Sequence, residues 1–148
     1  MRSDARRQDV TLPGTADRLV AGLLVLTHAV LLAWAAAGLV EMAWIDTPWP
    51  PISNPLFSNA MLLLQWLVVA GAALTFLFGF ARRWPRLREV MTGWYLVMAA
   101  ICAWQTFFTL ESEWRFAAMA LEYAAYAGII LYLHRSTYMR ERLSGTPG

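Results

Sequence analysis

The sequence predicts an all-α membrane protein, a four-transmembrane-helix bundle made of two hairpins with both termini in the cytoplasm. Its 148 residues are 59% hydrophobic and 15% charged, with a mean hydropathy of +0.46. A soluble domain has about 45–50% apolar and about 25% charged residues, so this chain has more apolar residues than a soluble core would use. Four long apolar runs and a one-sided distribution of arginine support the same prediction.

The apolar runs divide the chain into a central membrane domain and two tails. Residues 1–16 are polar and are expected to form a flexible cytoplasmic tail. About 20 apolar residues cross a hydrocarbon core of roughly 30 Å, and four runs within residues 17–136 reach that length. The expected helices span residues 18–44, 59–81, 89–110 and 115–134. Residues 137–148 are polar and basic and are expected to form a second cytoplasmic tail.

The first run also has a rival interpretation as a signal peptide, because Ala35, Ala36 and Ala37 offer small residues at a cleavage site. The run is longer than the usual apolar core of a signal, about 7–15 residues, and it contains His28. These features favour a transmembrane helix. The stretch that follows contains Pro48, Pro50 and Pro51, and it is expected to be a turn-rich loop.

Arginine placement predicts the orientation. The segment from Arg82 to Glu89 joins the two hairpins and holds four arginines. Further arginines flank the first and last runs, and only Arg115 lies near the other two loops. Cytoplasmic loops carry an excess of basic residues, so both termini and this turn are expected in the cytoplasm. The predicted location is therefore the inner (plasma) membrane, crossed four times.

Some chemistry is excluded by residue usage. All basic residues other than the two histidines are arginines, which excludes lysine nucleophiles and Schiff bases. Cys102 is the single cysteine, so the chain can form neither an internal disulfide nor a dithiol redox site. We find no spacing typical of metal ligands, no nucleophile–base pair and no indication of a particular cofactor. Nucleic acid is not an expected partner.

Polar residues inside the apolar runs are the candidate ligand-binding residues. Charge in mid-bilayer costs roughly 2.5–3.5 kcal/mol on insertion scales, so such residues need partners or a function. The candidates are Glu122, Gln65, Gln105, Glu41, Tyr126 and His28. The first three lie at similar depth, so they are expected to form a polar nest that opens toward the outer side. The alternative is a hydrogen-bonded cluster that only specifies helix pairing.

Small residues spaced by four predict packing faces, because they let helices approach closely in lipid. One row is Gly71, Thr75 and Gly79, and the other is Ala120, Ala124 and Gly128. Both rows are expected to hold the bundle together, with docking of a partner helix as the alternative. The segments that begin at Leu64 and Leu121 also share a residue pattern, which indicates either a repeated hairpin or a chance match.

Three functions fit these features. The first is a non-catalytic subunit or accessory factor of a membrane complex, in contact with lipid and with other membrane chains or copies of itself. The second is a carrier or binder of a small lipophilic or cationic molecule at the polar nest around Glu122. The third is a quinone- or haem-associated redox protein, although the different depths of His28 and His134 disfavour a shared haem.

Overall fold

The computed structural model describes residues 14–44 and 56–144, and this part of the chain is entirely helical outside its turns. The helices are α1 (Thr15–Trp44), α2 (Asn59–Ala81), α3 (Leu87–Phe108), α4 (Arg115–Arg135) and α5 (Thr137–Leu143). The predicted helical bundle is confirmed, and α1 to α4 are each long and apolar enough to cross a membrane. The proline-rich loop and most of the N-terminal tail lie outside the described residues.

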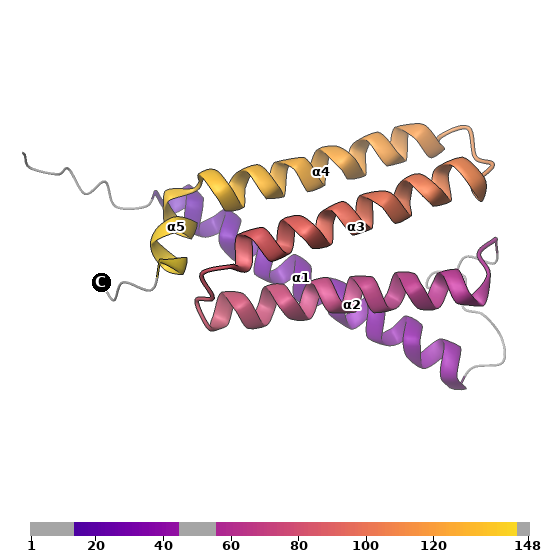
Figure 1. Ribbon diagram of the computed structural model, residues 1–148, viewed down its shortest axis with the longest axis horizontal. Coiled ribbons are helices and arrows are strands. Elements are labelled where there is room, and N and C mark those ends of the chain that lie inside the picture. The colour runs from indigo at the N-terminus through magenta and orange to yellow at the C-terminus, as the bar shows by residue number, and fades with distance from the viewer. Residues whose placement is uncertain (1–13, 45–55, 145–148) are drawn as a thin grey trace, which may run out of the picture.

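The helices are arranged as a row of three with a fourth crossing it. Figure 1 shows α2, α3 and α4 side by side, with α1 running diagonally behind them. The start of α1, the α2–α3 turn and α5 lie at one end of the molecule. We call this the arginine end, because it carries Arg18, Arg82, Arg83, Arg86, Arg88, Arg135, Arg140 and Arg142. The opposite end, where α1 and α3 finish, is called the far end.

The turn between α2 and α3 is a hydrogen-bonded helix ending. The backbone N–H of Trp84 donates to the carbonyl of Gly79 at 2.8 Å, and that of Arg83 donates to Phe80 at 3.4 Å. These two bonds form the Schellman motif, which needs a left-handed residue after the helix. Arg83 supplies it with φ of 51°. Pro85 follows and prevents α2 from continuing.

Small residues on α2 bring α3 close at the arginine end. A Cβ atom at Gly71 would lie 2.8 Å from Cη2 of Trp94, and one at Gly79 would lie 2.6 Å from Cδ1 of Leu87. The indole Nε1 of Trp94 also donates to Thr75 Oγ1 at 3.2 Å. The predicted packing row on α2 is therefore confirmed.

The row on α4 is not packed, and its predicted role inside the bundle is wrong for this chain alone. A Cβ atom at Gly128 would meet nothing within 4 Å. Ala120 and Ala124 are exposed as well, and Leu133 is the one residue of α4 that is fully buried. The spacing is the same as on α2, but within residues 14–44 and 56–144 no neighbouring helix covers this face of α4.

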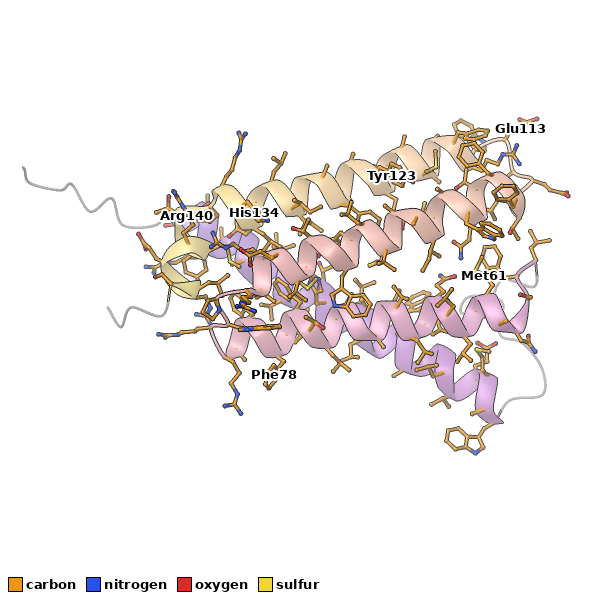
Figure 2. The ribbon with its side chains drawn as sticks, in the orientation of Figure 1. Met61, Phe78, Glu113, Tyr123, His134 and Arg140 are labelled. Atoms are coloured by element: carbon orange, nitrogen blue, oxygen red, sulfur yellow. The ribbon has the colours of Figure 1, made fainter. Side chains whose placement is uncertain are left out.

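The short helix α5 is not predicted by the sequence, where residues 137–148 read as a tail. Ser136 caps it by accepting from the backbone N–H of Met139 at 3.3 Å. Met139 and Leu143 are fully buried against the bundle. The guanidinium of Arg142 lies 4.0 Å above the ring of Phe80. In this way α5, which carries the labelled Arg140, covers the arginine end beside His134 (Figure 2).

The crossing of α1 and α2 makes the two halves of the bundle different. On the side toward the arginine end, the His28 ring of α1 stacks on Phe76 of α2 with centroids 3.9 Å apart. Toward the far end, α1 packs on α2 through Ala35, Leu62 and Trp66, which form a separate small core. The hairpin of α3 and α4 shows no such crossing, since these two helices run alongside each other (Figure 1). A repeat that relates the two hairpins therefore stays a prediction.

Candidate functional site

A small polar cavity lies between α2, α3 and α4. Its volume is about 50 Å³. Its polar lining comes from Gln65 on α2, Gln105 on α3, and Glu122 and Tyr126 on α4. The remaining lining residues are Val68, Val69, Met98, Ile101 and Cys102. Four of the six candidate residues from the sequence thus meet at one place.

The two glutamines bridge α2 and α3. Nε2 of Gln105 donates to Oε1 of Gln65 at 2.8 Å, across 40 residues of sequence. Nearer the arginine end, Gly71 and Gly79 of α2 allow α3 to approach closely. At the level of the two glutamines α2 and α3 lie further apart, and the long glutamine side chains span the distance (Figure 1). This pairing leaves the NH₂ group of Gln65 and Oε1 of Gln105 without a hydrogen-bond partner among the described residues.

Glu122 is held by two donors of different kinds. The hydroxyl of Tyr126, one turn further along α4, donates to Oε1 in a short hydrogen bond. The Cys102 thiol, from α3, donates to Oε2 at 3.1 Å. The side chain is therefore fixed on the cavity side of α4, although Glu122 as a whole is exposed. The sequence pattern gave no indication of this contact between Cys102 and the carboxylate.

The carboxylate retains the capacity to bind a further donor. An ionised carboxylate offers about four acceptor positions, and Tyr126 and Cys102 occupy two of them. A ligand in the cavity would meet these free positions together with the unpaired groups of Gln65 and Gln105. This set accepts more hydrogen bonds than it donates, which suits a ligand that carries N–H groups, above all a cationic one.

His28 lies outside this cavity, deeper toward the arginine end. Its Nδ1 lies 2.7 Å from the carbonyl oxygen of Leu24, which can only accept, so Nδ1 carries the proton. Nε2 then accepts from the Tyr95 hydroxyl at 2.9 Å. His28 is 2% exposed, and both of its ring nitrogens are occupied. The Tyr95 ring lies 5.4 Å from that of Tyr126, which connects this pair to the cavity through aromatic packing.

Glu41 is not brought to the cavity either. It lies near the far end of α1 and is 3% exposed. One turn before Glu41, the Trp66 indole packs directly on the backbone of Gly38. A Cβ atom at Gly38 would lie 2.3 Å from Cε2 of that ring, so only glycine fits there. Trp66 is thus a packing residue of the α1–α2 interface and does not line a ligand site.

An apolar groove lies next to the polar cavity. It has a volume of about 390 Å³ and is lined by Met61, Leu64, Val97, Ala100, Ile101 and Trp104. Figure 2 shows Met61 in the space between α2 and α3, near the far end. Ile101 belongs to the lining of both spaces, so its side chain separates the groove from the polar cavity.

The described residues contain no group of three or more His, Cys, Asp or Glu side chains that could hold a metal ion. His134 is exposed and its Nε2 lies 3.1 Å from Thr92 Oγ1, at the arginine end. It does not approach His28, so these two residues form no common site.

Comparison of the chain with protein-family models, with curated proteins and with solved structures gave no match. The case for a function therefore depends on the geometry of the polar cavity and of the helix faces around it.

Proposed function

We propose that this chain is a multi-pass protein of the inner (plasma) membrane that binds a small cationic molecule at Glu122. Four helices are long and apolar enough for the span, and the positive-inside rule assigns the arginine end to the cytoplasm. The polar cavity then lies in the outer half of the bilayer, since Glu122 is seven residues, or about 10 Å, from the start of α4.

The observation that carries the proposal is the arrangement of Glu122. Its carboxylate is fixed by Tyr126 and Cys102, faces a cavity with two amide groups, and keeps acceptor capacity. An ionisable residue within the bilayer marks a functional site by default. A purely structural cluster would use its donors and acceptors among its own members, whereas this one leaves part of Gln65, Gln105 and Glu122 for another molecule.

The test compares an amine with the alcohol of equal chain length. Purified protein in mild detergent is heated in the presence of hexylamine or hexanol. A ligand that binds only the folded state raises the melting temperature, so the amine should stabilise the native protein more than the alcohol does. The variant E122Q should lose the difference. The control E113Q removes an exposed carboxylate from the α3–α4 turn and should retain it.

An equal effect of the amine on the parent protein and on E122Q would refute cation binding at Glu122. So would an amine effect that matches the effect of the alcohol. Both results can be obtained from protein that elutes as a single species, which excludes loss of folding as the cause.

The uncovered face of α4 favours a second function, that of a membrane subunit in a larger complex. Ala120, Ala124 and Gly128 present an exposed small-residue face, and none of the helices described for this chain packs on it. A transmembrane helix from another chain, or from a second copy, could approach closely there. Extraction in mild detergent should yield an assembly larger than the monomer, and G128L should reduce it.

The control for this second function is G93L, because Gly93 is also exposed with nothing within 4 Å but lies on α3. If G93L and G128L both leave the size of the assembly unchanged, the α4 face is not an interface.

A further inference from the structure

We propose that the ligand of Glu122 is an amphiphile, with a single cationic head in the polar cavity and an apolar chain in the neighbouring groove. This inference depends on the proposed function, because it names the class of molecule that the Glu122 site takes. It adds a second binding element, the groove between α2 and α3, and it predicts that the ligand reaches the site from the lipid.

The first argument comes from the two volumes. Small-molecule sites usually measure about 300–1,000 Å³. The polar cavity has about 50 Å³, which is less than two waters in the liquid at about 30 Å³ each. It can hold an ammonium group or a similar small head, but no larger body. The groove has about 390 Å³, so the remainder of a ligand fits there.

The second argument comes from chemistry. The groove lining contains no charged residue, and its only polar atom in a side chain is the indole nitrogen of Trp104. The cavity on the other side of Ile101 collects a carboxylate, two amides and a phenol. A molecule that lies across Ile101 therefore meets acceptors at one end and hydrocarbon at the other. The carboxyl oxygens of Glu122 act as acceptors here, so they favour a head that donates N–H groups over a phosphate or carboxylate head.

The third argument is access. Leu64, Val97 and Trp104 line the groove, and their side chains are 49%, 45% and 56% exposed. In a bilayer this exposed lining faces lipid chains. Ile101 is the residue that lines both the groove and the polar cavity. A chain can therefore lie in the groove while its head passes Ile101 to reach Glu122.

The test uses dodecylamine with a nitroxide on its chain, and dodecanol with the same label. The protein is reconstituted in lipid vesicles, and quenching of tryptophan fluorescence is followed during titration. A nitroxide held in the groove should quench Trp104, so the amine should show a saturable component that is lost in W104F. W114F is the matched control, because Trp114 is exposed at the far end and lies outside the groove.

Two further variants assign the two parts of the ligand. A100W fills the groove and should remove saturable quenching of the remaining tryptophans, whereas L121W places a tryptophan at an exposed position on α4 and should not. E122Q should raise the amine concentration at which the saturable quenching is half complete by about tenfold or more. This factor corresponds to the loss of one hydrogen bond to a charged group. The alcohol should show only the linear quenching of a molecule dissolved in the lipid.

The outcomes separate this inference from the proposed function. If E122Q abolishes stabilisation by hexylamine while A100W and W104F leave dodecylamine quenching unchanged, the head site stands and the groove proposal is wrong. If A100W abolishes saturable quenching but E122Q has no effect on either amine, the groove binds chains and the proposed role of Glu122 is wrong. Equal quenching by the amine and the alcohol would refute the proposal that the ligand is a cationic amphiphile.

Discussion

Gln105 donates a 2.8 Å hydrogen bond to Gln65, and this bond joins α2 to α3 where their backbones no longer touch through small residues. In water such a bond would compete with solvent, but in lipid the two amides have few other partners. The pair therefore bridges the helices beside the polar cavity, and it leaves the NH₂ group of Gln65 and Oε1 of Gln105 unpaired among the described residues.

A double-mutant cycle should measure this bond. Q65L and Q105L should each destabilise the bundle, and the double variant should lose less than the sum, because each single change leaves an unpaired amide. The coupling should be about 0.6 kcal/mol and no more than about 1.7 kcal/mol, the range found for hydrogen bonds between membrane helices. Unfolding in detergent mixtures provides the free energies. Additive effects would show that the two amides do not bond.

Glycine substitutions should separate the two small-residue rows. G71L drives a side chain into Trp94 and should destabilise the chain by about 1–3 kcal/mol, the usual cost of overpacking. G128L meets open space and should leave the monomer as stable as the parent. Thermal unfolding of the purified monomer checks both variants. A destabilised G128L monomer would mean that α4 has a neighbour that differs from the arrangement described above.

Removal of the Tyr95 hydroxyl should destabilise the core. In Y95F the buried Nε2 of His28 loses its donor, and an unsatisfied buried group costs about 1–3 kcal/mol. The control is Y123F, which also removes a tyrosine hydroxyl, in this case one that donates to Ala99 O at an exposed position. The loss of unfolding free energy should be clearly greater for Y95F. Equal losses would show that the His28–Tyr95 bond contributes nothing particular.

Reporter fusions test the orientation. Fusions after Arg83 and after Arg142 should report the cytoplasm, because both positions lie at the arginine end. A fusion after Pro51 should report the outer side. A cytoplasmic signal from the Pro51 fusion would contradict the four-span topology, and a mature N-terminus near Gly38 would instead support the signal-peptide interpretation.

Length and hydropathy were sufficient to predict the four long helices. A span of about 30 Å needs about 20 consecutive apolar residues, and runs of that length are visible in the sequence whatever the helix propensities of the individual residues. The proximity of Gln65, Gln105 and Glu122 was also predicted from the sequence. Polar residues at the same depth in neighbouring helices are expected to face one another inside the bundle, and these three line one cavity. Depth was not sufficient for Glu41, because α1 crosses α2 and carries its far half away from α4 (Figure 1).

Rotation of a helix about its axis was the main feature that the sequence did not reveal. The rows that contain Gly71 and Gly128 have the same spacing, but spacing defines a face and not the helix that covers it. The contact between Cys102 and Glu122 has the same origin, because it depends on how α3 and α4 are turned toward each other. A seven-residue helix such as α5 is too short for periodicity to identify.

The crossing of α1 over α2 means that α1 is held by different neighbours at its two ends. At the arginine end, Tyr132 and Ser136 both donate to Asp17, so the first turn of α1 is tied to the last turns of α4. Beyond the stacked rings of His28 and Phe76, α1 follows α2 alone. Because α2 is itself joined to α3 by the Trp94–Thr75 hydrogen bond and by the close contact at Gly79, the far half of α1 is positioned through α2. A change that loosens the packing of Ala35 against Leu62 and Trp66 should therefore reach the neighbouring Gln65–Gln105 bond through α2.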